Sequence, residues 1–302
     1  MSNQTLRRRD ITALALGAIG TGVAGKAFAA KPAARIKLGS GSDTTTTTTN
    51  TTTTTSTDTS TYCGLSLDSY NHDSFAGQTW NVNRDTSKSY AIQQVVGTTP
   101  PRHRFEVRNG DFWVNDSNVR NRAEFQCLTR YEPGRDVWFS YAIRIRKGTP
   151  VTKWNVIGQF HATPDSSDGN ASPPFAIELN PDSAGGEAMR FVRRFDPQPT
   201  TSVSPQPIVM HKRAFARDHW YHIVGRVVFG WRDDAAVDLW MDGAKIISLA
   251  NTNVGYNDLK GPYWKFGVYR AATAETLIVD YANMEIGVTS LLSRVGSPLP
   301  IL

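Results

Sequence analysis

Two side chains on one predicted strand have the chemistry to bind negative charge and to move a proton. The segment 263–270 (YWKFGVYR) alternates aromatic or β-branched residues with residues of other kinds, which predicts a β-strand. Because strand side chains alternate faces, Lys265 and Tyr269 share one face with Gly267 between them. We interpret the glycine as leaving space for a ligand that lies across the strand. The simpler alternative is an edge strand with a solvated lysine and a tyrosine at its rim.

Two further predicted strands carry polar groups at the same two-residue spacing. These groups are Arg122, Glu124 and Gln126 in the segment 120–126, and Gln159 and His161 in the segment 154–161. Any one of them could be a satisfied structural residue. A buried sheet face cannot hold all of them without partners or water. Together the three strands therefore predict one concave polar face lined for a ligand.

The remaining globular sequence is rich in short strand signals. Val137 to Ile145 alternates cleanly, and 237–246 reads as a hairpin with an Asp242-Gly243 turn. Clusters of Gly, Pro and Asn separate such runs, and no long helical period appears. Residues 62–302 are therefore predicted to form one all-β domain, either a sandwich or a jelly roll.

The first 61 residues are predicted to lie outside this domain. Residues 1–30 have the features of an export signal of the twin-arginine type: Arg7-Arg8-Arg9, a short apolar run, and small residues up to Ala30. Residues 31–61 are rich in threonine and predict a linker with no core. We expect a periplasmic or secreted protein, with no membrane span in its mature form.

The formal net charge of +6 is concentrated at the N-terminus. Seven basic residues and one acidic residue lie in the first 38 positions, which leaves 26 of the 33 basic and 26 of the 27 acidic residues for the rest. A neutral domain lacks the broad basic footprint of a nucleic-acid-binding protein. It can still bear a local basic groove for an anionic polymer.

The cysteine count permits one bridge. Cys63 and Cys127 both lie beyond the predicted signal, and an exported domain would allow them to form a disulfide. Neither has a neighbouring cysteine at metal-binding spacing. One histidine and one carboxylate at the candidate site are fewer ligands than a transition metal gathers, so we expect no metal and no required cofactor there. A structural Ca²⁺ in a loop such as 165–170 is an open possibility.

Three motifs resemble those of family-7 alginate lyases, in the same order. Arg122-Ala123-Glu124-Phe125 is similar to R-(S/T)-E-L, Gln159-Phe160-His161 to Q-(I/V)-H, and the segment 263–269 to Y-F-K-A-G-x-Y. The surroundings resemble more closely the related group of heparin lyase I and glucuronan lyase. Two departures, Phe125 for Leu and Arg270-Ala271 for Asn-Gln, count against alginate. The resemblance implies a concanavalin-like β-jelly roll that cleaves a uronic-acid polymer by β-elimination.

The resemblance also implies roles for the site residues. Elimination removes the proton at C5 and expels the oxygen at C4, so the uronate carboxylate must be neutralised, which suits Arg122 and Gln159. Tyr269 is expected to protonate the leaving oxygen. In glucuronate, Tyr269 could serve as base too, whereas in guluronate or iduronate His161 would be the base. Lys265 is expected to bind substrate, and Glu124 to orient Arg122.

Other residues are weaker candidates for substrate contacts. They are His103, Arg270, Arg193, and the further basic residues Arg190, Arg194, Lys212 and Arg213. We expect a monomer whose partner is an anionic polysaccharide. The competing hypotheses are a non-catalytic sugar-binding module, an alginate or glycosaminoglycan lyase, a glycoside hydrolase, and a surface protein on a threonine stalk. A hydrolase would need paired carboxylates, and the sequence offers no such strand.

Overall fold

The computed structural model describes residues 72–75, 78–85, 87–95, 102–116, 119–183 and 185–301. All of them belong to the unit that spans Thr55–Leu302. The predicted export signal, the threonine-rich linker and Cys63 lie outside the described residues. Within the described part, no helix is long and apolar enough to cross a membrane.

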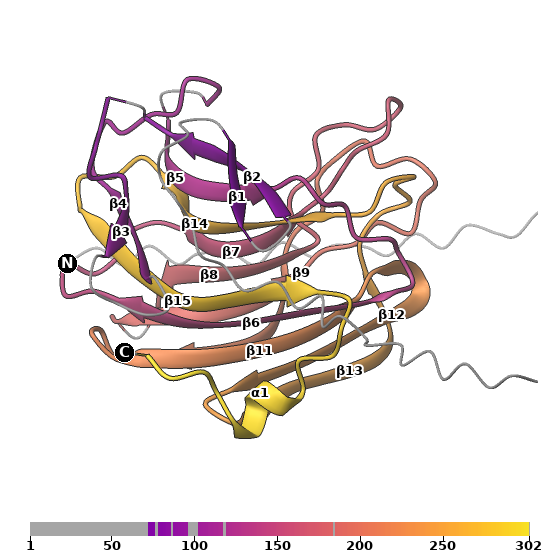
Figure 1. Cartoon of the computed structure of the whole chain (residues 1–302). Coiled ribbons are helices and arrows are strands. Elements are labelled where there is room, and N and C mark those ends of the chain that lie inside the picture. Colours follow the sequence, from indigo (N-terminus) through magenta and orange to yellow (C-terminus); the bar gives the residue numbers. More distant parts are fainter. Residues whose placement is uncertain are drawn as a thin grey trace, which may run out of the picture. The chain divides into compact units, whose positions relative to one another are not determined.

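The described chain forms two antiparallel β-sheets (Figure 1). The eight-stranded sheet has the order β1(His72–Phe75), β2(Gln78–Arg84), β5(Arg120–Cys127), β14(Tyr263–Ala271), β7(Asn155–His161), β8(Phe175–Pro181), β9(Glu187–Arg193), β10(Ile208–Ala214). The seven-stranded sheet has the order β13(Ala244–Val254), β12(Gly230–Met241), β11(Trp220–Val228), β6(Asp136–Ile145), β15(Leu277–Gly287), β4(Arg102–Val107), β3(Ile92–Val95). A short helix, α1(Ser293–Gly296), follows the last strand.

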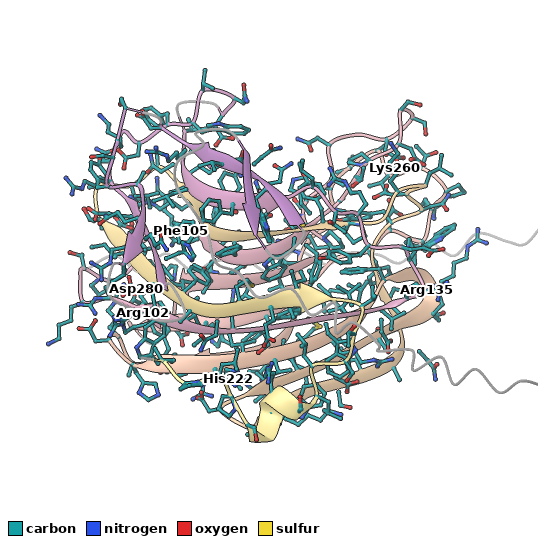
Figure 2. All side chains as sticks on the ribbon, in the orientation of Figure 1. Arg102, Phe105, Arg135, His222, Lys260 and Asp280 are labelled. Atoms are coloured by element: carbon teal, nitrogen blue, oxygen red, sulfur yellow. The ribbon has the colours of Figure 1, made fainter. Side chains whose placement is uncertain are left out.

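The core lies between the two sheets and is largely aromatic. The predicted alternation in β6 is confirmed, since Val137, Phe139, Tyr141 and the isoleucines that follow at the same spacing are fully buried. From the other sheet, Trp264 stacks on Phe139 at 5.0 Å between ring centroids. Figure 2 shows the side chains that fill this space, Phe105 among them. Each such side chain stabilises the fold by about 1.5–3 kcal/mol through burial alone.

The two-sheet arrangement confirms the predicted jelly roll and brings the three polar strands together. In the eight-stranded sheet β14 lies between β5 and β7. Lys265 pairs with Gln126 on one side and with Gln159 on the other. Because directly paired residues of antiparallel strands point to the same face, the polar side chains of all three strands share the outer face of this sheet. The predicted hairpin is also confirmed, with Asp242 and Gly243 at positive φ between β12 and β13.

Candidate active site

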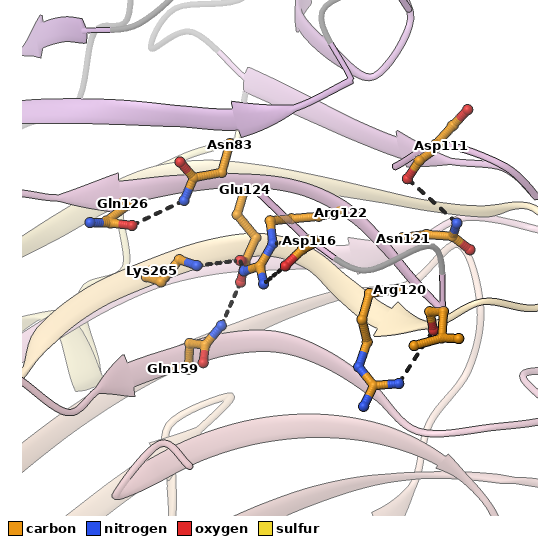
Figure 3. Close-up of polar contacts among 11 residues, drawn as sticks. Asn83, Asp111, Asp116, Arg120, Asn121, Arg122, Glu124, Gln126, Gln159 and Lys265 are labelled. Carbon is orange, nitrogen blue, oxygen red and sulfur yellow. Dashed lines mark hydrogen bonds and ion pairs between the residues drawn. The ribbon is translucent and has the colours of Figure 1, made fainter. Parts of the chain in front are cut away.

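A buried carboxylate, Glu124, is the centre of the polar face. It accepts a hydrogen bond from Gln159 Nε2 at 2.6 Å and pairs with Lys265 Nζ at 2.7 Å and with Arg122 Nη1 at 2.5 Å. Figure 3 shows these three side chains converging on Glu124 from β7, β14 and β5. On the same sheet, Asn83 of β2 donates to Gln126 at 3.0 Å. Glu124 thus contacts Arg122, Gln159 and Lys265, and its expected role of orienting Arg122 stays a prediction.

The electrostatics of this cluster follow from its burial. Burial alone would raise the pKa of Glu124, but Lys265 and Arg122 outweigh that effect and hold the pKa below its ordinary value. Burial lowers the pKa of Lys265 to about 8, although Glu124 opposes the shift. Both groups are therefore charged near neutral pH. A buried ion pair of this kind keeps its geometry because separating the partners leaves an uncompensated charge.

Arg122 is clamped on two sides. Its Nε and Nη2 donate to the carboxylate of Asp116 at 2.6 and 2.9 Å, in addition to the bond to Glu124. Burial by itself would lower the pKa of Arg122, but Glu124 and Asp116 outweigh it and raise the pKa. The guanidinium carbon lies 3.8 Å from the centroid of the Tyr269 ring and 5.4 Å from that of Trp113. The cation thus fixes the phenol ring against β5.

His161 lies at the end of β7 with one ring nitrogen already committed. Its Nδ1 is 2.8 Å from the carbonyl of Ala162, so Nδ1 carries the proton and Nε2 keeps its lone pair. The ring stacks on Tyr263 at 5.2 Å, and the guanidinium of Arg130 covers the same tyrosine at 3.9 Å. Burial, helped by Lys265, lowers the pKa of His161 to about 4. The imidazole is therefore neutral and able to accept a proton at neutral pH.

Two irregularities in the sheet set the position of Tyr269. The register breaks between Phe266 and Tyr269 where β14 meets β7, and between Val156 and Gly158 where β7 meets β8. The hydroxyl of Tyr281, a buried residue of the opposite sheet, donates to the carbonyl of Ile157 and lies 3.0 Å from that of Gly267. One tyrosine of the opposite sheet thus contacts both irregular strands from the core side.

Gly267 has a different role from the predicted one. Its φ is +126°, and an added Cβ would lie 2.3 Å from the carbonyl oxygen of Ala123 and 2.8 Å from the Phe105 ring. The glycine is required by the close approach of β5 and the core. It does not open space above the polar face, so that interpretation of the sequence was wrong.

Three predicted substrate contacts lie elsewhere. His103 is 2% exposed and packs edge-on against Phe125 at 5.9 Å, because His103 and Phe105 point inward from β4; burial lowers its pKa to about 4. Arg270 points to the face opposite Tyr269, is fully buried, and donates to the backbone carbonyl of Glu275 at 2.6 Å.

Arg193 is the third residue that the structure separates from the site. It pairs in register with Phe175, which belongs to the core, and donates to the carbonyl of Asn253 at 2.5 Å. Like His103 and Arg270, it is removed from the predicted substrate contacts. Cys127 is buried at the end of β5, and the bridge to Cys63 stays a prediction.

In the acidic loop that follows β7, the carboxylates accept hydrogen bonds from backbone N–H groups. Asp165 accepts from the N–H of Leu259, and Asp168 accepts from that of Thr201. Burial, followed by Asp168 and Asp165, raises the pKa of Asp258 to about 7. Across the described ranges, no group of three or more histidine, cysteine or acidic side chains is placed to hold a metal ion. Calcium in this loop stays a prediction.

Sequence reasoning missed four residues of the site. Asp116, Trp113, Arg130 and Tyr263 all contact predicted site residues. Tyr263 was on the predicted strand and at the correct spacing, so its position beside His161 could have been inferred once the two strands were paired. The first three lie on connecting segments, where no periodicity reveals which way a side chain points.

Several solved structures share the fold. They include alginate lyase A1-II′, a member of polysaccharide lyase family 7, at 12% identity and a TM-score of 0.50, with 70% of this chain and 95% of that chain covered. An endo-β-1,4-glucuronan lyase from the fungus Trichoderma reesei (16%, TM-score 0.49) and an alginate lyase from Pseudomonas aeruginosa (17%, TM-score 0.48) each match 70% of this chain, and 94% and 98% of their own. At 12% identity, the likeness to alginate lyase A1-II′ shows the fold alone. No curated protein matches the chain.

The jelly-roll fold is thus shared with a member of polysaccharide lyase family 7. A family model described as polysaccharide lyase matches residues 42–284. Because that match spans well over half of the chain, the protein belongs to the polysaccharide lyase family. It is an enzyme, and its substrate is a polysaccharide.

Proposed function

We propose that this lyase cleaves a 4-linked uronic-acid polymer of the glucuronan kind by β-elimination, leaving an unsaturated uronate at the new end. The observation that carries the proposal is the buried Glu124, which fixes Arg122, Gln159 and Lys265 on one face beside Tyr269 and His161. A binding module has no need of this arrangement, because hydrogen-bond donors suffice for affinity. An elimination needs donors and proton carriers together.

Neutralisation of the substrate carboxylate falls to the clamped donors. Arg122 has five N–H groups, of which Asp116 and Glu124 take three, so two remain for a substrate carboxylate. The Gln159 amide is held by Glu124 and lies next to them in the sheet. Donors fixed before the substrate arrives need no reorganisation when charge moves onto the carboxylate in the transition state.

The proton transfers fall to Tyr269 and His161. The base takes the C5 proton, the C5–H electrons form the C4=C5 double bond, the bond between C4 and the leaving oxygen breaks, and the acid protonates that oxygen. In glucuronate the C5 hydrogen and the C4 oxygen lie on the same side of the ring. Tyr269 can therefore act first as a base and then as a phenol acid, and the Arg122 guanidinium over its ring holds the phenol in place. His161 Nε2 is the base for a polymer in which the two groups are opposed.

The sequence is the basis for proposing glucuronan as the substrate and for proposing where in or outside the cell the enzyme works. The surroundings of the motifs resemble the glucuronan lyase group, and two departures from the alginate lyase pattern count against alginate. We further propose that residues 1–30 are an export signal and that residues 31–61 are a linker between this signal and the lyase domain. The enzyme would then work as a monomer in the periplasm or in the medium. This places it where large anionic polysaccharides are accessible.

The test is product formation on a panel of polymers. The enzyme is incubated with glucuronan, alginate, heparin and hyaluronan, and the ultraviolet absorbance of the unsaturated uronate is followed. Tyr269→Phe should lower kcat on the preferred polymer by at least ~10², with KM little changed, because only the phenol oxygen is lost. Tyr141→Phe is the matched control, since its buried hydroxyl has no hydrogen-bond partner within the described residues. If Tyr269→Phe retains more than about a tenth of kcat, the proposed role for this strand is wrong.

A further inference from the structure

One line of paired residues crosses the eight-stranded sheet from the candidate site toward its far edge. The successive partners on its outer face are Arg122, Tyr269, Val156, Glu178, Arg190 and Lys212. Since neighbouring strands lie about 4.8 Å apart, three strand spacings put Arg190 about 14 Å from Tyr269. That distance spans a few sugar units of a polymer lying across the strands.

The next charged residue along this line, after the apolar Val156, is Glu178. This buried carboxylate accepts from Arg190 Nη2 at 2.8 Å and from Arg194 Nη2 at 3.2 Å, so two guanidinium groups share one carboxylate. Asn180 donates to the same carboxylate at 3.2 Å. Arg190 keeps 27% of its side chain exposed, and its buried Nε has no partner in the part of the chain that is described. The group therefore carries a surplus positive charge with donors to spare, unlike the balanced cluster at Glu124.

The surface between the two charged groups is apolar. Val156, Ala176 and Val192 form a small cluster on the outer face, with Trp154 and Tyr269 packed against it. Trp154 meets Tyr269 edge-on at 5.3 Å between ring centroids. An apolar floor between widely spaced polar groups suits a pyranose chain, whose C–H faces pack on apolar side chains while its carboxylates reach the cations.

We propose that Arg190, held in place by Glu178, is a distal subsite for the carboxylate of a uronate unit a few sugars away from the bond that breaks. The polymer then lies perpendicular to the strands, along the row from Arg122 to Lys212. The inference rests on the proposed function and adds to it that the enzyme recognises charge at a distance from the reacting sugar. Arg190 touches no reacting atom, so its contribution is to binding.

The test compares long and short substrates in an Arg190→Gln variant of the full chain. On glucuronan, kcat/KM should fall about 10- to 100-fold, mainly through KM, which is the loss expected for one hydrogen bond to a charged group. On glucuronan oligosaccharides too short to reach Arg190, the variant should match the parent. Folding should be kept because Arg194 and Asn180 still satisfy Glu178, and thermal unfolding checks this.

Arg193→Gln is the matched control. It removes a guanidinium three residues along the same strand, on the opposite face, so the ratio of long-substrate to short-substrate activity should stay at the parent value. Binding provides a second readout: Arg190→Gln in a Tyr269→Phe background should weaken affinity for glucuronan, and the loss should shrink as salt is raised.

Each outcome decides a separate point. Equal losses on long and short substrates, or no loss on the polymer, would overturn the distal subsite while leaving the lyase assignment intact. Failure of the parent enzyme to release unsaturated product from any uronate polymer would overturn the proposed function itself, and the subsite with it.

Discussion

Replacing Tyr281 by Phe will measure how much the two strand irregularities matter for the site. The change removes only a hydroxyl, because the ring still packs edge-on against Phe105 at 5.4 Å and against Phe266 at 5.2 Å. The lost group donates to Ile157 and lies 3.0 Å from the carbonyl of Gly267, both next to register breaks. No cavity larger than the hydroxyl is made.

The magnitude follows from counting donors. A hydroxyl has one hydrogen, so the substitution strips one buried carbonyl of its donor. Leaving a buried acceptor unsatisfied costs about 1–3 kcal/mol, and the free energy of unfolding should fall by that amount. Gly267 lies two residues before Tyr269, so relaxation of the strand moves the phenol. A displacement of about 1 Å in a reacting group can cost ~10² in rate, so kcat should fall while KM changes less.

Tyr141→Phe again provides the control. Tyr141 is as deeply buried as Tyr281, and their ring centroids are 5.7 Å apart. Its hydroxyl has no hydrogen-bond partner among the residues described. Its loss should leave the free energy of unfolding unchanged or raise it. Denaturant unfolding and steady-state kinetics on glucuronan are measured for both variants. Equal destabilisation by the two would refute the hydrogen-bond argument, and a destabilised Tyr281→Phe with parental kcat would show that the irregular strands do not position Tyr269.

Three further expectations concern the proton carriers, the acidic loop and the cysteines. His161→Ala should leave measurable activity on glucuronan but abolish any activity on a guluronate polymer, and equal losses on both polymers would contradict the stereochemical argument. Because the pKa of His161 is about 4, any rate that depends on His161 as the base should fall only as the pH drops toward that value. In Asp258 the pKa is raised from 3.8 to about 7, so the folded state holds a proton that the unfolded chain releases, and stability should fall as pH rises through that window. Asp258→Asn should accordingly unfold at a higher temperature than the parent at pH above 7 and show no such gain near pH 4; a gain at both would refute it. A Cys63–Cys127 bridge would close a loop of about 64 residues and contribute about 4 kcal/mol, and an intact mass with two free thiols would contradict it.

The polar face could be predicted because its signals are local. Two-residue spacing in each of three segments places Glu124, Gln159 and Lys265 on polar faces, and apolar residues between them fix which face is buried. That these strands are neighbours depends on pairing between residues more than 100 positions apart, as between β5 and β14. At the level of sequence, the link rested on the shared polar character of the three strands and on the resemblance to known lyases.

Strict alternation failed where the sheet is irregular. Val156 and Gln159 are three residues apart, so a regular strand would put them on opposite faces. The register break between Val156 and Gly158 places both on the outer face, and Val156 becomes part of the apolar floor beside Tyr269. Nothing in the sequence around Gly158 distinguishes such a break from an ordinary glycine in a strand.

The misplaced polar residues share a physical cause. Arg270 and His103 were weaker candidates for substrate contacts, and the structure buries both away from the polar face. Arg270 finds its partners in the backbone carbonyls of Glu275 and Val107, and His103 stays neutral under burial. Which partner a buried polar group finds depends on the segments that pack around it in the folded sandwich. A local sequence pattern does not encode those tertiary neighbours.

The distribution of charge over the outer face suggests how binding and chemistry are divided. At Glu124, two cations meet two carboxylates, so the cluster is formally neutral and attracts a polyanion only weakly. Its proposed role is to hold fixed donors, whose hydrogen bonds would strengthen as negative charge develops on the reacting sugar. The surplus charge lies instead around Glu178, where the proposed contact with the polymer would be the same before and during reaction. Binding at the proposed subsite would lower KM without stabilising the reacting sugar in its ground state, so the site at Glu124 would still favour the transition state.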